Sequence, residues 1–152
     1  MAIFDAMFEL DDALDLSTHT ATEVEPSTNV INWGASDLEM GAGEPLYLNV
    51  RVATAFGSSG SATLKVALKR ETDGTIDTDS TTIWETNAIP VATLVAGYRI
   101  IRMSLPYNVD EDQYTGLLYT IGTTAMTAGT VDAWIDHGPQ SSYDTQVSES
   151  NI

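Results

Sequence analysis

Residues 41–70 read GAGEPLYLNVRVATAFGSSGSATLKVALKR, and this stretch decides the fold. Apolar and polar residues alternate along 45–54 and again along 61–70, which is the period-two pattern of strands with one buried face. The tetrapeptide GSSG at 57–60 separates the two runs and is typical of a flexible hairpin loop. The stretch therefore predicts a central β-hairpin.

The alternation also predicts which side chains face the core. The inward residues of the two strands are Leu46, Leu48, Val50, Val52, Ala62, Leu64, Val66 and Leu68. Similar patterns predict further strands at 29–33, 81–86, 98–105, 114–122 and 129–136. The N-terminal segment fits either a strand (Phe8, Leu10, Leu14, Leu16) or a helix (Ile3, Met7, Leu10, Leu14), and a strand is favoured because the remainder is β.

About eight short strands separated by turn residues predict an all-β protein, a single-domain sandwich or barrel. Two connections, 72–80 and 87–97, are longer than tight turns. Long connections are where Greek-key and jelly-roll chains cross between sheets. No internal repeat and no linker divides the 152 residues into two domains.

The chain is strongly acidic, with 22 Asp and Glu against six Lys and Arg and a net charge of −16. The six bases lie between positions 51 and 102: Arg51, Lys65, Lys69, Arg70, Arg99 and Arg102. Nucleic-acid binding needs basic surface that displaces phosphate counterions, so we expect no nucleic-acid partner. Two explanations of the acidity stay open: solubility alone, or acidic ends that meet a basic partner.

Other features of composition narrow the class of protein. Hydrophobic residues make up 43% of the chain, which predicts a globular protein. Cysteine is absent, which excludes disulfides and thiolate metal sites. No apolar run approaches the roughly 18 residues of a membrane span. The N-terminus MAIFDAMFELDD carries acids where a signal peptide carries bases, so no export signal is expected.

Motifs that carry chemistry are missing from the sequence. His19 and His137 have no second histidine or cysteine at ligand spacing, and there is no nucleophile elbow or phosphate loop. Asp73, Asp77 and Asp79 could offer oxygens to Ca²⁺, although their order is not that of an EF-hand and a solvated loop is favoured. Residues 110–112, DED, are predicted to form an exposed turn. We expect no enzyme, cofactor or metal.

Aromatic residues outside the predicted core indicate a possible contact surface. Trp134 and Tyr47 lie on the faces of their strands opposite the apolar rows, and Phe4, Phe8 and Tyr143 lie near the termini. Exposed aromatics on a sheet face are typical of a partner interface. Local packing under a terminal arm is the alternative. The candidate interface residues are Phe4, Phe8, Tyr47, Trp134 and Tyr143.

The order of several short motifs resembles the jelly-roll cement, or head decoration, proteins of tailed bacteriophages. The motifs that carry the resemblance are STNVINWG (27–34), GAGEPLYLNV (41–50), TAF (54–56), GSATLKVAL (60–68), LVAG (94–97), LP (105–106), LLYTIG (117–122) and MTAGTVDA (126–133). They cover nearly the whole domain. GEPLYL and TAGTV are the most specific of them.

The resemblance implies an eight-stranded jelly-roll β-sandwich: an N-terminal arm and first strand region at 1–26, the jelly-roll domain at 27–143 and a tail at 144–152. It implies a structural protein of the virion's outer surface, made in the host cytoplasm, with no membrane partner. Its expected partner is the major capsid protein, bound between neighbouring subunits of the mature icosahedral head. We expect a homo-oligomer, with a dimer favoured over a trimer.

Three other functions remain open on the residues alone. A lectin-like, carbohydrate-binding sandwich on a virion surface would need Trp134 or Tyr47 exposed beside polar groups. A small acidic hydrolase would need two carboxylates converging in a cleft. A tail or baseplate component would share the composition of a head component.

Overall fold

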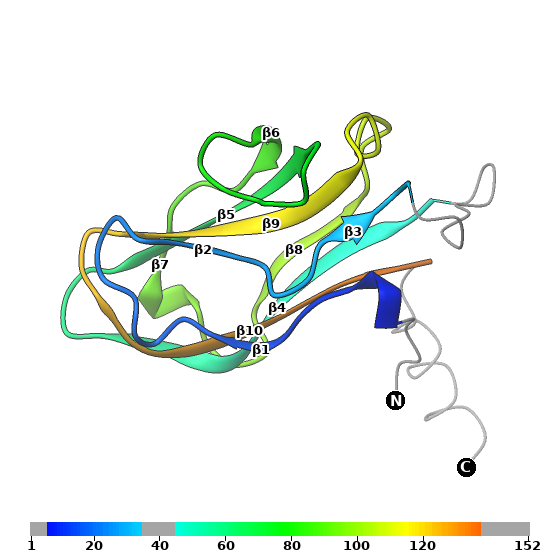
Figure 1. The fold of residues 1–152 in the computed structure, drawn as a ribbon. Helices are drawn as coiled ribbons and strands as arrows, with labels where there is room; N and C mark the ends of the chain where they lie inside the picture. Colours follow the sequence, from blue (N-terminus) through cyan, green and yellow to red (C-terminus); the bar gives the residue numbers. More distant parts are fainter. Residues whose placement is uncertain (1–5, 35–44, 138–152) are drawn as a thin grey trace, which may run out of the picture.

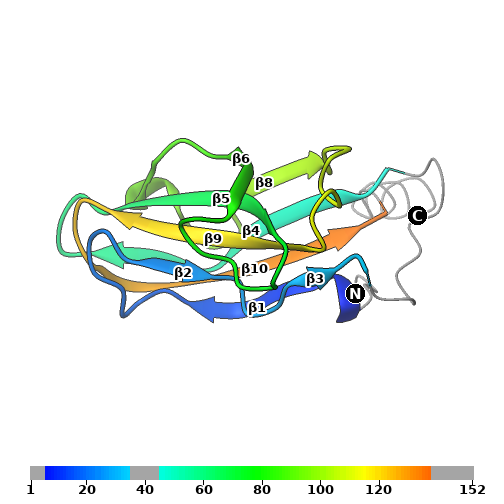
Figure 2. The ribbon, with the colours of Figure 1, turned by 45° about the horizontal axis from the view of Figure 1, so that its top comes forward.

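The computed structural model describes residues 6–34 and 45–137, and this part of the chain folds into two packed antiparallel sheets (Figure 1). Sheet A has the strand order β1-β10-β4-β8, and sheet B the order β2-β9-β5-β6, with β3 beside β9 and β7 beside β5. Figure 2 shows the two layers from a second direction. The elements are η1 (Ala6–Phe8), β1 (Glu9–Asp15), β2 (Val24–Pro26), β3 (Ile31–Asn32), β4 (Tyr47–Ser58), β5 (Thr63–Glu71), β6 (Thr81–Glu85), β7 (Ile89–Pro90), η2 (Val91–Thr93), β8 (Arg99–Ser104), β9 (Tyr114–Gly122) and β10 (Met126–Asp136).

The all-β prediction is confirmed. The described residues hold ten strands, against the eight predicted, and the two that the pattern did not indicate are the short β2 and β7. The N-terminal segment contains the predicted strand, β1. Strands β1 and β2 lie in the segment expected to form the arm and first strand region, and they belong to sheets A and B respectively. No helix of the described residues is long and apolar enough to cross a membrane.

The core lies between the sheets and is built from the rows that the alternation identified. Leu48, Val50 and Val52 of β4 are fully buried, and so are Leu64, Val66 and Leu68 of β5. Strands β8, β9 and β10 contribute alternate residues to the core: Ile101, Leu117, Tyr119, Ile121, Val131, Ala133 and Ile135. Each strand of a sandwich buries every second side chain, which is why a period of two predicts this core.

The predicted hairpin at 41–70 is wrong. Strand β4 pairs with β10 and β8 in sheet A, whereas β5 pairs with β9, β6 and β7 in sheet B. The connection between them crosses from one sheet to the other, beside the β9–β10 connection. Ser58 Oγ joins the two crossings by donating to the backbone carbonyl of Ala125 (2.7 Å). The inward rows of β4 and β5 therefore face each other across the core.

One of the two long connections crosses between the sheets, and the other stays within one sheet. Residues 87–97 lead from β6 in sheet B to β8 in sheet A, so this predicted crossing is confirmed. Residues 72–80 join β5 to β6 within sheet B, so that crossing is wrong. This loop instead packs onto its own sheet, because Ile76 is 4% exposed and a Cβ built on Gly116 of β9 would lie 2.8 Å from its side chain.

Candidate interaction surface

Trp134 lies on the outer face of sheet A, half-buried, within a small cluster of charged side chains. It pairs with Glu9 of β1 on one side and Asn49 of β4 on the other. The guanidinium carbon of Arg51 lies 5.6 Å from the ring centroid, within cation–π range. Arg51 also pairs with Asp132 (2.6 Å), and Trp134 Nε1 donates to Asp136 Oδ2 (3.2 Å). The ring therefore already has a cation over it, which leaves less of it for stacking on a sugar.

Tyr47 is brought close to Trp134. It is half-buried on the same outer face and pairs with Asp136 of β10 and Ser104 of β8. Since Trp134 pairs with Asn49, the two aromatic residues are diagonal neighbours on adjacent strands, a spacing that aromatic side chains can bridge. The structure thus places Tyr47 and Trp134 together at one end of sheet A.

The other three candidate interface residues have different surroundings. Phe8 in η1 is half-buried and packs against the core, with its ring centroid 6.4 Å from that of Trp33. It therefore covers the end of the core, which is the local-packing alternative. Phe4 and Tyr143 lie outside the described residues.

The outer face of sheet A separates its charges by strand. The acids directed away from the core lie on β1 and β10, and the bases lie on β4 and β8. The acids are Glu9, Asp12, Asp15, Asp132 and Asp136, and the bases are Arg51, Arg99 and Arg102. Because the strand order is β1-β10-β4-β8, one half of the face is acidic and the other half basic. A period-two pattern gives the face but not the order of the strands, so the sequence alone did not predict this separation.

The acidic loop 72–80 uses its carboxylates to bind its own backbone. Asp73 Oδ1 accepts from the Thr75 amide (2.9 Å), and Asp77 Oδ1 accepts from the amides of Asp79 (2.8 Å) and Ser80 (3.0 Å). These amide hydrogen bonds lower the pKa of Asp77. Within the described ranges, no three His, Asp or Glu side chains converge as metal ligands. In this structure, Asp73 and Asp77 therefore accept hydrogen bonds from the backbone of their own loop.

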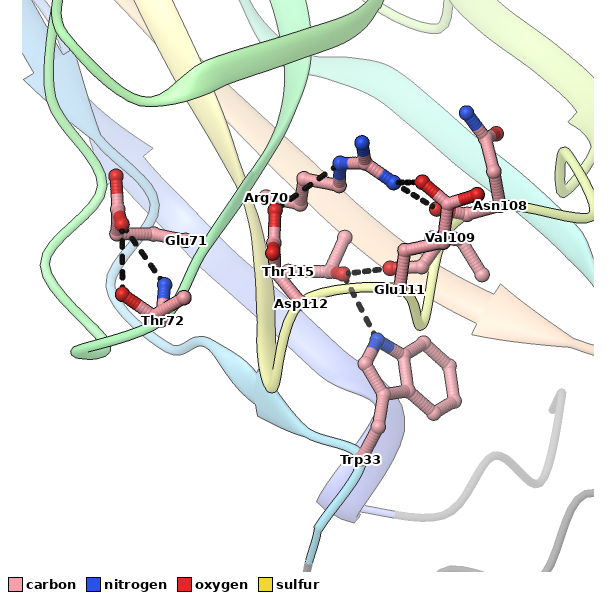
Figure 3. Close-up of polar contacts among 9 residues, drawn as sticks. All are labelled: Trp33, Arg70, Glu71, Thr72, Asn108, Val109, Glu111, Asp112 and Thr115. Atoms are coloured by element: carbon pink, nitrogen blue, oxygen red, sulfur yellow. Dashed lines mark hydrogen bonds and ion pairs between the residues drawn. The ribbon is translucent and has the colours of Figure 1, made fainter.

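The second acidic cluster, at 110–112, is held by a base from sheet B (Figure 3). Arg70 of β5 forms ion pairs with Glu111 and Asp112 (3.1 Å for Asp112) and donates to the carbonyl of Asn108 (3.0 Å). Asp110 is exposed, and among the described residues it is the one acid of this cluster that forms no ion pair with Arg70. The predicted exposed turn is therefore a loop clamped to β5.

Within 6–34 and 45–137, four large apolar residues are exposed, and sequence reasoning missed all of them as surface candidates. They are Met7, Trp84, Val95 and Tyr107, at 46%, 37%, 57% and 94%. Tyr107 lies in the β8–β9 loop, where alternation gives no information. The signal in the sequence that could have indicated its exposure was its position as an aromatic residue within the polar turn PYNVDED.

A buried polar contact also escaped the sequence analysis. Asp11 of β1 is 2% exposed, and its two carboxylate oxygens accept from the hydroxyl of Tyr119 and the amide of Thr28, each at 2.7 Å. Tyr119 belongs to β9, so this contact joins sheet A to sheet B. Burial raises the pKa of Asp11 despite these hydrogen bonds, and it raises that of Tyr119 well above its ordinary range.

Comparison with models of protein families finds a match over most of the sequence. The family model described as Bbp16 matches residues 16–135, which is most of the chain and nearly the whole sandwich. No curated protein matches the sequence.

Proposed function

The chain belongs to the Bbp16 family, a phage-related family, and on that premise we propose that it is a capsid cement protein. It binds the outer surface of a tailed-phage icosahedral head, between neighbouring major capsid subunits, and stabilises the mature shell. The observation that carries the proposal is the pairing order of the strands in a chain from a phage-related family. The motif order quoted above supports it independently.

The strand order supports the finer description of the sandwich as a jelly roll. Strand β1 pairs with β10, β2 and β3 with β9, β4 with β8, and β5 with β6. The first half of the chain thus pairs antiparallel with the second half in reverse order, like one long folded ribbon. Successive pairs alternate between sheets A and B. Rolling such a ribbon into two sheets produces the paired Greek keys of a jelly roll.

A cement acts by linkage and needs no catalytic group. A protein that binds the assembled shell more tightly than free subunits stabilises the shell by the free energy of that binding. Each contact can be modest in area when one oligomer spans several subunits, because the linked contacts gain avidity. A rigid sandwich suits this role, since little conformational freedom is lost when it binds.

The charge separation on sheet A supports the homo-oligomer, with a dimer favoured. A twofold axis that runs parallel to the strands, above the outer face and between β10 and β4, would place Arg99 and Arg102 of β8 opposite the acidic β1 of the second copy. Self-complementary surfaces of this kind are what twofold interfaces require. The pair Tyr47 and Trp134 would lie near such an interface, where aromatic residues are enriched.

The oligomer is tested by mass. Light scattering should give a discrete dimer, and Arg102→Glu should weaken it, whereas Lys65→Glu on sheet B should leave the mass unchanged. A wild-type monomer at micromolar concentration would contradict this part of the proposal.

The cement function is tested on expanded heads of the encoding phage that lack this protein. The purified chain should co-sediment with them at fixed stoichiometry and raise their melting temperature. Failure of the purified chain to bind heads at low salt would refute the proposal. Binding to a glycan array would then favour the lectin-like alternative.

A further inference from the structure

We propose that Tyr107, on the 105–113 loop between β8 and β9, is the anchor that enters an apolar slot of the shell surface, and that basic residues border this slot. The inference rests on the proposed function and names the part of the chain that makes the contact. It combines three observations on the described residues: the exposure of the ring, the contacts that hold its loop and the charge around it.

The exposure of Tyr107 is extreme for an aromatic residue. Its side chain is 94% exposed, whereas the half-buried Tyr47, Trp134 and Phe8 pack against their neighbours. A buried tyrosine removes a large apolar area from water, and Tyr is among the residues that dominate binding energy at interfaces. Here that area is not used in the fold, so it is available to a partner.

The loop that carries Tyr107 is fixed on its C-terminal side by the clamp in Figure 3. Arg70 donates to the carbonyl of Asn108, the next residue after Tyr107, and pairs with Glu111 and Asp112 further along. The Arg70 side chain is only 17% exposed, so its contacts are partly shielded from solvent. Three points of one loop are therefore held by one guanidinium group.

The core and the neighbouring strands hold the loop as well. Val109 is 2% exposed within the core, and its carbonyl accepts from the buried hydroxyl of Thr115 (2.6 Å). Trp33 Nε1 donates in turn to that hydroxyl (2.8 Å). On the N-terminal side, the Leu105 amide donates to the carbonyl of Leu46, the residue that precedes β4 (2.8 Å). The backbone of Tyr107 is thus positioned before binding, which lowers the ordering cost of binding.

The charge around the ring indicates the chemistry of the partner. Residues 105–113 hold three acids and no base, and with Arg70 the local net charge is 1 − 3 = −2. Residues 103–152 contain no base at all. An acidic rim around an apolar anchor fits an apolar slot bordered by lysine or arginine, and its attraction should weaken with salt. The occupant to which we commit is a subunit of the shell, not a second copy of this acidic chain.

The direct test replaces Tyr107 by alanine in the full chain and measures binding to heads that lack the protein. Because the side chain is so exposed, Tyr107→Ala should leave the melting temperature and the oligomer mass of the free protein unchanged. Its affinity for heads should fall about 10- to 100-fold. Tyr107→Phe, which keeps the apolar ring, should lose less than Tyr107→Ala. Val95→Ala, an exposed apolar residue in the loop that precedes β8, is the matched control and should bind as wild type does.

A second variant tests the clamp. Arg70→Met removes the guanidinium and keeps Tyr107, so the loop should exchange its amide hydrogens faster and the affinity for heads should fall several-fold. Arg70→Lys should restore part of both. A merely structural role of Arg70 would change the exchange rate and leave the affinity of the folded protein as it was, which would contradict the positioning role.

The outcomes separate this inference from the cement proposal. If wild-type protein does not bind heads, the cement proposal fails and the inference fails with it. If wild-type binds and Tyr107→Ala binds equally well, the inference alone is overturned. It is also overturned if Tyr107→Ala changes the oligomer mass, because Tyr107 would then belong to the contact between copies of the chain.

Discussion

Replacing Tyr119 by phenylalanine should destabilise the sandwich from its interior. Tyr119 is fully buried on β9, and its hydroxyl donates to the carboxylate of Asp11 on β1. The substitution keeps the ring and removes one hydrogen bond to a buried carboxylate. The carboxylate keeps Thr28 as its partner in this contact. An isosteric change of this kind tests the hydrogen bond without opening a large cavity.

The size of the loss follows from the burial of the carboxylate. Hydrogen bonds to charged groups contribute about 1.5–3 kcal/mol, and the partner left behind keeps its desolvation cost. We therefore expect Tyr119→Phe to lower the free energy of unfolding by about 2 kcal/mol. For a domain of this size, that corresponds to a fall in melting temperature of about 4–8 °C. Calorimetry and urea unfolding at pH 7 measure both quantities. A loss below about 0.5 kcal/mol would refute the reasoning, because it would mean that Asp11 is solvated.

The same contact makes a prediction about pH. Burial raises the pKa of Asp11, so the folded state holds this proton more tightly than the unfolded state. The resulting stability is fully present below the unfolded pKa of about 3.9 and is lost as the pH rises through the folded pKa. Asp11→Asn removes this loss, because its amide can still accept from Thr28 and donate to the Tyr119 oxygen.

The difference in unfolding free energy between Asp11→Asn and wild type should therefore shift in favour of the variant as the pH rises from about 4, and then level off. Asp12→Asn, which removes the adjacent exposed charge, is the control for the change in net charge. A difference that stays constant with pH would show that the proton on Asp11 is not linked to folding.

Two further substitutions test the packing of strands and loops. Gly129→Ala should cost about 2–4 kcal/mol, measured by urea unfolding, because φ is +133° there and a Cβ would lie 2.3 Å from the ring of Phe56. Its double mutant with Phe56→Leu should cost less than the sum of the two single changes, and additive costs would contradict the clash. Lys69→Met should speed amide hydrogen exchange in residues 72–80, because the ammonium group donates to the carbonyls of Thr78 (3.1 Å) and Ser80 (3.0 Å). An unchanged exchange rate would show that the loop keeps its structure without these two hydrogen bonds.

The faces of the strands could be predicted from the sequence, whereas their partners could not. Leu48 and Val50 of β4 and Leu64 and Val66 of β5 are buried as predicted, because burial itself produces the period of two. The same pattern fits a hairpin and a crossing between sheets, since each strand buries one row in both cases. Which of the two forms depends on pairings with β9 and β10, more than 40 residues away along the chain. No local pattern records those pairings.

The candidate surface also has features that the sequence could predict and features that it could not. Tyr47 and Trp134 were assigned to an outer face by the alternation of their strands, and the structure places them there as neighbours. Their partial burial depends on Arg51 and Asp132, whose approach requires β4 and β10 to be adjacent. Tyr107 lies in a loop, where no period distinguishes a side chain that packs from one that is held in solvent.

Most of the basic side chains, which are clustered in the middle of the sequence, contact loops and acids of the chain itself. Lys69 is 6% exposed, because its ammonium group reaches into the 72–80 loop. Its neighbour Arg70 holds the 105–113 loop, so two adjacent bases of β5 fix two loops at one end of the sandwich. Arg51 and Lys65 pair with acids of the strands beside them, β10 and β6.

Arg99 and Arg102 on β8 remain, and among the described residues neither forms an ion pair. Four of the six bases therefore act within the chain, and only β8 presents basic groups that a partner can reach without breaking an ion pair. An otherwise acidic chain thus has two distinct contact chemistries: a basic strand at one edge of sheet A, and an acidic loop carrying Tyr107 that follows the same strand. Opposite charges next to each other suit contacts with two different surfaces. This arrangement supports the proposal that the protein binds both a second copy and the shell.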